Sequence, residues 1–192
     1  MQGLWKALRA GLVILTLFAA SCSAPYTAYR HDLVQGQTLL RQRDYDDARK
    51  AFERAALAMP DAEAYALAAT ASYKANDMAG VWQYLEQAER ARGMKSFSAF
   101  RIMAYKALVL FKTGRDAEAF NVLKDYTYAY SNAFISSNTR DIELVWKRQR
   151  VENLAQLEKM LDEDVGAYEE SIEQFYSTGT GYFDRNSGSA RP

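Results

Sequence analysis

Residues 43–60 read RDYDDARKAFERAALAMP, with three carboxylates near the start and a proline at the end. Carboxylates in a first turn favour the positive end of a helix dipole, and proline, which lacks an amide hydrogen, ends the unit. Between them Ala48, Phe52 and Ala55 recur at spacings of four and three, so they share one face. A face of small, large and small residues lets a neighbouring helix approach closely. The stretch therefore predicts one helix of a packed helical pair.

The residues around this helix resemble the tetratricopeptide repeat (TPR), a helix–turn–helix unit of roughly 34 residues. The matching positions are Gly36, Tyr45, Ala48, Phe52, Ala55 and Pro60. The resemblance implies a helix A near residues 28–42 and a helix B near residues 46–59.

Two further copies follow, at residues 62–91 and 99–130. In the first of them Val81, Leu85 and Ala88 repeat the helix B stripe. Glycine, proline and β-branched runs are sparse throughout. We therefore expect an all-α fold, in which residues 29–131 form about three TPR-like hairpins in a short right-handed solenoid and a C-terminal capping or extension helix follows.

The last copy departs from the repeat pattern, because Tyr126 stands where a small residue is expected. With Tyr128, Tyr130 and Phe134 it forms an aromatic collar at the end of the repeats. One interpretation is a core plug that caps the stack. The other is an aromatic patch that binds a partner, since tyrosine anchors are common at interfaces.

The N-terminus has the pattern of a secretory signal peptide. Lys6 and Arg9 precede an uncharged run at residues 10–21, which spans only ~18 Å as a helix against a hydrocarbon core of ~30 Å. Residues 1–21 are thus too short and too asymmetric in charge for a membrane span, and they predict a cleaved leader.

The only cysteine, Cys22, follows this run directly and resembles the acylated cysteine of a bacterial lipobox. Ala19 departs from the leucine-like residue that the lipobox prefers three positions earlier. Ser23, instead of an aspartate, implies transport to the outer membrane. The resemblance implies palmitate-type acylation of Cys22, with residues 22–28 as a lipidated tether. The other interpretation is a buried structural cysteine behind an ordinary signal peptide.

Residues 132–176 lose the repeat spacing and carry an apolar stripe at mostly three–four spacing, typical of a coiled coil. Its members are Trp146, Leu154, Leu157, Leu161, Val165, Tyr168, Ile172 and Phe175. Gly166 is a candidate break. A polar-faced cap of the repeat stack explains the first turns. The full length suggests an assembly helix that pairs with a partner helix or forms an antiparallel homodimer.

Residues 177–192 are rich in glycine and serine and predict a disordered tail, with the pair Tyr182-Phe183 as a less favoured docking motif. Ser131–Ser137 is expected to be a loop.

Enzyme chemistry finds little support in the composition. The chain has one histidine, His31, and one cysteine, so it lacks the ligands of a zinc site, and no phosphate-binding loop stands between a strand and a helix. We expect no catalytic residue, metal or cofactor. After removal of residues 1–21 the chain keeps 22 basic and 24 acidic residues, a balance that gives no reason to expect nucleic acid.

In the TPR family the helix A side chains line a concave groove that takes an extended peptide or a partner helix. The corresponding positions here are Arg30, Leu33, Gln37, Arg41, Ala66, Thr70, Tyr73, Lys74, Arg101, Ala104, Leu108 and Lys112. Five of them form a basic rim, which suits a partner segment with acidic residues. The other interpretation is a solvated basic face that binds nothing.

The resemblance thus implies a non-enzymatic, lipid-anchored TPR scaffold that binds proteins in the bacterial cell envelope, on the periplasmic side of the outer membrane. Small TPR lipoproteins of outer-membrane protein assembly, secretin assembly and cell-wall enzyme recruitment form the comparison group. The alternative is a structural subunit of a secretion, export or pilus-assembly complex, held through its C-terminal helix.

Overall fold

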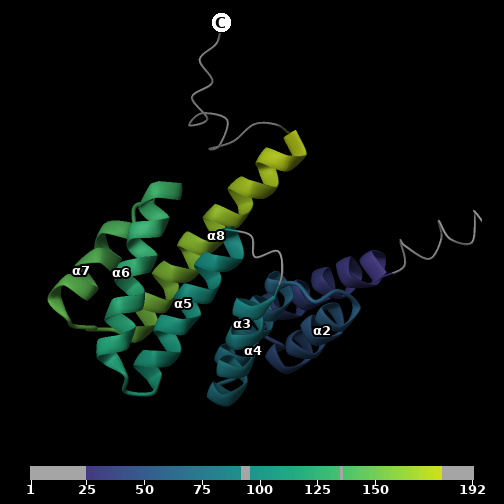
Figure 1. Cartoon of the computed structure of the whole chain (residues 1–192), viewed down its shortest axis with the longest axis horizontal. Coiled ribbons are helices and arrows are strands. Elements are labelled where there is room, and N and C mark those ends of the chain that lie inside the picture. Colours follow the sequence, from purple (N-terminus) through teal and green to yellow (C-terminus); the bar gives the residue numbers. More distant parts are fainter. Residues whose placement is uncertain (1–24, 92–95, 135, 179–192) are drawn as a thin grey trace, which may run out of the picture.

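A computed structural model describes residues 25–91, 96–134 and 136–178 of the chain. Within these ranges all regular secondary structure is α-helical, which confirms the all-α prediction (Figure 1). The expected signal peptide and Cys22, together with residues 179–192 of the expected tail, lie outside the described residues.

The helices follow one another with short connections. The first helix occupies residues 25–41 of the described chain. The others are α2 (Tyr45–Ala58), α3 (Ala62–Lys74), α4 (Met78–Arg90), α5 (Ser96–Lys112), α6 (Asp116–Ala133), α7 (Thr139–Arg148) and α8 (Leu154–Thr178). The predicted pair at residues 28–42 and 46–59 matches the first helix and α2 closely. The first helix begins at residue 25, within the expected tether at residues 22–28.

The three turns that join these helices in pairs share one local design, which the turn after α7 also adopts, with Gln149 at a φ of 50° and the N–H of Arg150 donating to the carbonyl of Val145 at 3.2 Å. Arg43, Asn76 and Gly114 each adopt a positive φ, of 65°, 62° and 72°, directly after a helix. In each turn the next residue's N–H donates to the carbonyl five residues earlier, as in a Schellman motif. The donors are Asp44, Asp77 and Arg115, and the acceptors are Leu39, Ser72 and Leu110, at 3.0, 2.9 and 2.9 Å. The first helix with α2, α3 with α4, and α5 with α6 are therefore hairpins of one kind.

Close packing of the first hairpin depends on Gly36. A Cβ at this position would lie 2.5 Å from the ring of Phe52, which is fully buried on α2. The first helix and α2 therefore approach each other closely where Gly36, which has no side chain, faces the large ring of Phe52. Tyr29 and Leu33 on the same helix complete this cluster against Ala48, Ala55 and α3.

The aromatic collar belongs mainly to the core. Tyr126 and Tyr130 on α6 are fully buried, and Phe100 of α5 lies edge-on between them and Tyr168 of α8, with ring centroids 4.8–6.0 Å apart. The core-plug interpretation is thus confirmed for Tyr126 and Tyr130. Tyr128, by contrast, is 75% exposed.

The C-terminal region differs from the expected single extension. Helix α6 continues to Ala133, so the expected loop at Ser131–Ser137 starts later than predicted. The break falls after α7, where Gln149 has a φ of 50° and the side chain of Asn153 accepts the N–H of Gln156 at 3.1 Å. Gly166 does not break α8, which runs through it without interruption.

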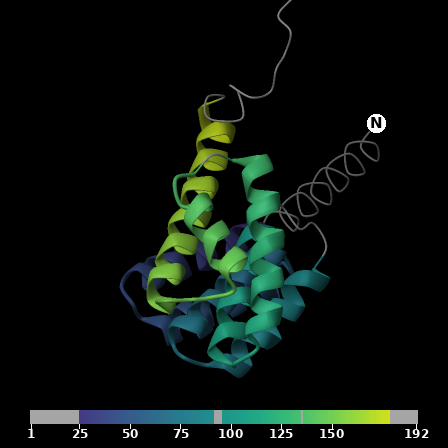
Figure 2. The same cartoon turned by 90° about the vertical axis from the view of Figure 1, so that its left-hand side faces the viewer.

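Helix α8 folds back along α5 in the opposite direction, and its C-terminal end projects beyond the other helices (Figures 1 and 2). Helix α7 packs along α6. None of the described helices is long and apolar enough to cross a lipid bilayer.

Candidate partner-binding groove

The predicted groove positions divide into three groups by burial. Six are buried: Leu33, Ala66, Thr70, Tyr73, Ala104 and Leu108. Gln37, Lys74 and Arg101 are half-buried, and Arg30, Arg41 and Lys112 are exposed. Half of the predicted positions therefore pack in the interior, and the other half keep some contact with solvent.

Over α3 and α5 the groove is occupied by α8. The Lys74 ammonium on α3 contacts the carboxylates of Glu158 and Asp162, the latter at 2.6 Å. The Tyr105 hydroxyl on α5 donates to the other oxygen of Asp162 at 2.6 Å. Two basic or phenolic groups of the groove thus converge on one acidic turn of α8.

On α5, one turn before Tyr105, Arg101 forms a bidentate ion pair with Glu169 of α8. Its Nε and Nη2 donate to the two carboxylate oxygens of Glu169 at 2.9 and 2.6 Å, and its Nη1 donates to Thr70 Oγ1 at 3.3 Å. The side chain of Arg101 is 13% exposed and that of Glu169 is 30% exposed. This pair is therefore shielded from solvent and strongly directional.

Titration shifts agree with this geometry. Burial alone would lower the pKa of Lys74, but its hydrogen bonds to Asp162 and Glu158 outweigh that effect and raise it. Burial alone would also lower the pKa of Arg101, but the charge of Glu169 and its hydrogen bonds outweigh that effect and raise the pKa. Burial and the charge of Asp162 raise the pKa of Tyr105, which stays a neutral donor. The charged groups of the groove are thus stabilised in their ionised form by α8.

The C-terminal stripe was interpreted as a surface for a second chain, but the chain itself covers half of its members. Leu157, Leu161, Val165 and Tyr168 are buried against α5 and the collar. The remaining members, Trp146, Leu154, Ile172 and Phe175, are half-buried. Trp146 lies on α7 and donates from its indole N–H to Thr127 Oγ1 at 2.9 Å. The break lies between α7 and α8 and not at the expected Gly166, so that α8 returns along α5 as one helix.

Sequence reasoning missed Tyr105 and the three acids of α8, Glu158, Asp162 and Glu169. A signal was present, because the acids recur at spacings of four and seven and therefore share one face. That face lies beside the apolar stripe. Matched against the basic rim of the groove, it would have pointed to a contact within the chain.

The first helix carries three solvent-accessible predicted groove positions for which no contact with α8 is found among the described residues, Arg30, Gln37 and Arg41, and we call these three the open part of the groove. Arg30 and Arg41 are exposed, and Val34 on the same helix is 50% exposed. Lys112, at the far end of α5, lies over the ring of Tyr73 with its ammonium 4.0 Å from the centroid. Of the three exposed basic residues at predicted groove positions, Arg30 and Arg41 thus lie on the first helix and Lys112 lies on α5.

Among the described residues, no group of three or more histidine, cysteine, aspartate or glutamate side chains is placed to hold a metal ion. In comparisons by sequence, no protein family and no curated protein matches the chain.

Proposed function

We propose that the chain is a non-enzymatic, lipid-anchored TPR scaffold of the bacterial cell envelope, which binds partner proteins on the periplasmic side of the outer membrane. The observation that carries the repeat assignment is the close approach of Gly36 to Phe52, which stand at two positions of the repeat pattern. Three hairpins end their first helix with a positive φ and the same hydrogen bond. The spacing of the residues between Gly36 and Pro60 supports the same assignment.

Binding of a protein segment is supported by the contact with α8. The groove over α3 and α5 takes an amphipathic helix, with acids of that helix on Lys74 and Arg101 and apolar residues between them. This is the helix-in-groove mode of recognition, realised within one chain. We propose that the open part of the groove, which carries the same kind of basic groups, receives a segment of a partner with exposed acidic residues.

The anchor is proposed from the sequence alone, from the basic and apolar leader that ends at Cys22. Acylation by two or three chains holds a protein firmly on a membrane, whereas a single chain binds marginally. A Cys22→Ser variant is expected to keep its helicity, to incorporate no radiolabelled palmitate and to leave the membrane fraction. Equal palmitate incorporation by this variant would contradict the anchor.

Partner binding is tested by photo-crosslinking in cells. A photoreactive amino acid replaces Arg41 in the open part of the groove or, as a control, Arg90, an exposed residue of α4. We expect a discrete crosslinked protein from position 41 that Arg30→Glu weakens, and none from position 90. Equal crosslinking from both positions, or none from position 41, would contradict a partner-binding groove.

The alternative of a complex subunit held through the C-terminal helix has weaker support. Its apolar stripe was the feature that suggested an external partner, and Leu157, Leu161 and Val165 in that stripe are buried within the chain.

A further inference from the structure

One end of the first hairpin exposes apolar side chains. Leu57, in the last turn of α2, is 84% exposed, and Tyr26, at the start of the first helix, is 57% exposed. Met59, which follows α2, is half-buried. We call Tyr26, Leu57 and Met59 the tether end.

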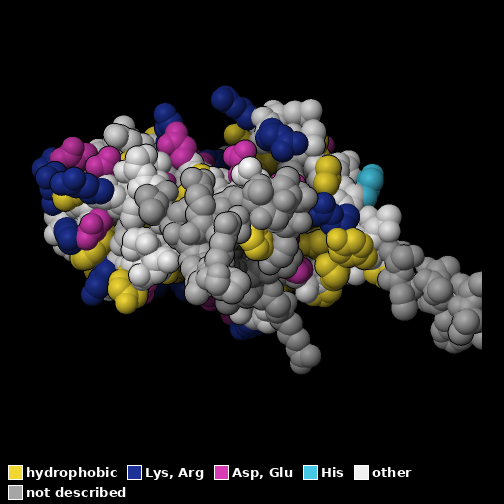
Figure 3. All heavy atoms as spheres, turned by 90° about the horizontal axis from the view of Figure 1, so that it is seen from above, with side chains coloured by type: hydrophobic (Ala, Val, Ile, Leu, Met, Phe, Trp, Pro, Cys, Tyr) yellow, Lys and Arg dark blue, Asp and Glu magenta, His cyan; other side chains and the backbone are white. Residues whose placement is uncertain are grey.

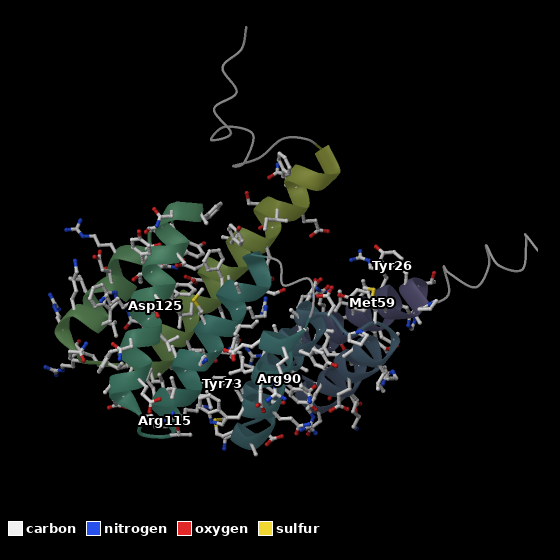
Figure 4. The ribbon with its side chains drawn as sticks, viewed as in Figure 1. Tyr26, Met59, Tyr73, Arg90, Arg115 and Asp125 are labelled. Carbon is white, nitrogen blue, oxygen red and sulfur yellow. The ribbon has the colours of Figure 1, made fainter. Side chains whose placement is uncertain are left out.

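These residues come together because the hairpin is antiparallel. Arg54 of α2 donates to Asp32 of the first helix at 3.2 Å, and the Tyr29 hydroxyl donates to Glu63 at 3.3 Å. The start of the first helix therefore lies beside the end of α2. Figure 4 shows Tyr26 and Met59 close to each other at the end of the molecule, and Figure 3 shows hydrophobic side chains gathered at that end.

The chain outside the described residues limits what can cover this end. Four residues lead from Cys22 to Tyr26, so their Cα atoms lie at most ~14 Å apart. If Cys22 carries the acyl chains of the proposed function, on which this inference rests, Tyr26 cannot leave the neighbourhood of the lipid headgroups. A lipid surface is then present at the tether end at a very high effective concentration.

The side chains at this end suit a bilayer interface. Tyrosine is enriched at membrane–water interfaces, where its ring contacts lipid and its hydroxyl stays hydrated. Tyr26 stacks on Tyr29 with the ring centroids 6.5 Å apart, which leaves its outer face open. Arg30 on the next turn is exposed, and a cation near anionic headgroups is favourable.

We propose that the tether end rests on the membrane, with Tyr26 and Leu57 in the headgroup region. The first hairpin then stands on its end. Arg41, 15 residues along the first helix from Tyr26, lies up to ~22 Å further from the bilayer. Gln37 and Arg41 of the open part of the groove therefore lie away from the membrane, where a partner can reach them, and Arg30 lies nearer to the headgroups.

The test uses the acylated full-length mature chain in vesicles of phosphatidylethanolamine with a minor fraction of phosphatidylglycerol. Acylated Cys22 has no free thiol and no other cysteine exists, so Leu57→Cys provides one site for an environment-sensitive fluorophore. Lys50→Cys is the matched control, because residue 50 is exposed and lies two turns earlier on the same face of α2. Only its distance from the tether differs.

We expect the fluorophore at position 57 to shift to shorter wavelength and to be quenched by spin-labelled lipid, and that at position 50 to be quenched by aqueous iodide instead. Equal iodide quenching at both positions, in protein whose acylation is verified by mass, would overturn the inference and leave the anchor intact. Absence of acylation would contradict the proposed function itself.

A second copy is the competing occupant. The same label at position 57 in unacylated Cys22→Ser protein, without vesicles, is expected to remain open to iodide at every protein concentration. Protection that grows with concentration would overturn the proposal in favour of self-association.

Discussion

At the scale of single residues, two helical glycines have opposite surroundings, so that adding a methyl group has different consequences at each. Gly36 faces the buried ring of Phe52, whereas a Cβ on Gly166 in α8 would meet nothing within 4 Å. Extra volume in a packed contact typically costs 1–3 kcal/mol, but alanine is a better helix former than glycine by roughly 0.5–1 kcal/mol.

The same substitution is therefore expected to have opposite effects. Gly36→Ala should lower the free energy of unfolding by about 1–3 kcal/mol, and Gly166→Ala should raise it by about 0.5–1 kcal/mol. Urea denaturation of both variants measures this. Equal changes of the same sign would mean that the close contact of Gly36 with Phe52 does not exist.

Asp164 is the least satisfied charge of the core. It is 1% exposed, its Oδ1 accepts a hydrogen bond from the Ser136 hydroxyl, and its Oδ2 has no partner among the described residues. Burial raises the pKa of this carboxyl, although the hydrogen bonds from Ser136 and Asn138 oppose the shift.

A raised pKa means that the folded state prefers the protonated form. The contribution of Asp164 to stability is thus complete at low pH and is lost as the pH rises from the ordinary aspartate value through the raised one. Asp164→Asn should be more stable than the parent at pH 7, with a difference that shrinks in acid. Thermal melts of both proteins at several pH values measure this difference, and a difference that does not change with pH would contradict the raised pKa.

At the scale of elements, α5 and α8 are joined by two polar side-chain contacts, Tyr105 with Asp162 and Arg101 with Glu169, and the second of these is an ion pair. Because the pair of Arg101 and Glu169 is shielded and bidentate, each single glutamine substitution should cost roughly 1.5–3 kcal/mol. The double variant should cost clearly less than the sum, since neither charge is then left without its partner.

Arg90→Gln, which removes an exposed pair with Glu86 four residues earlier, is the control and should cost at most ~0.5 kcal/mol. Chemical denaturation of the four-member cycle gives the coupling energy. Additive single effects would place Glu169 in solvent and α8 away from α5.

Sequence patterns predicted the elements of the first hairpin well, because its signals are local. Asp44 caps α2 by accepting the N–H of Asp47 at 3.4 Å, and the small–large–small stripe lies in the interior. The break before α8 was harder to locate. Gly166 is only a weak helix breaker, and it lies inside a strongly periodic apolar pattern. Asn153, which caps α8, lies in a stretch that is polar apart from Val151, where there is no apolar periodicity to mark the start of a helix.

At the scale of the whole molecule, the groove and the C-terminal stripe were each predicted as a binding surface, and each is the other's partner over α3 and α5. Their sites of contact are far apart in the sequence, such as Lys74 and Asp162. Helical periodicity defines which face of a helix is apolar. It does not define which chain covers that face, so the sequence alone could not indicate that α8 packs on α5 of its own chain.

Predicted groove positions are thus covered by α8 on α3 and α5, and exposed ones remain on the first helix. The second and third hairpins bind their own α8, and the first hairpin keeps the exposed Arg30 and Arg41. We therefore expect α8 to contribute to stability and propose that the first helix binds the partner.

Leu161 separates this account from an assembly helix most directly, because its side chain is fully buried within the chain. Leu161→Asp places a charge in that core, and Ala167→Asp places the same charge on the exposed face of α8. Light scattering and thermal melts of the unacylated protein compare both with the parent. The account predicts a monomeric parent, a loss of at least ~3 kcal/mol for Leu161→Asp and a change within ~0.5 kcal/mol for Ala167→Asp. A dimeric parent that Leu161→Asp converts into an equally helical and equally stable monomer would contradict it.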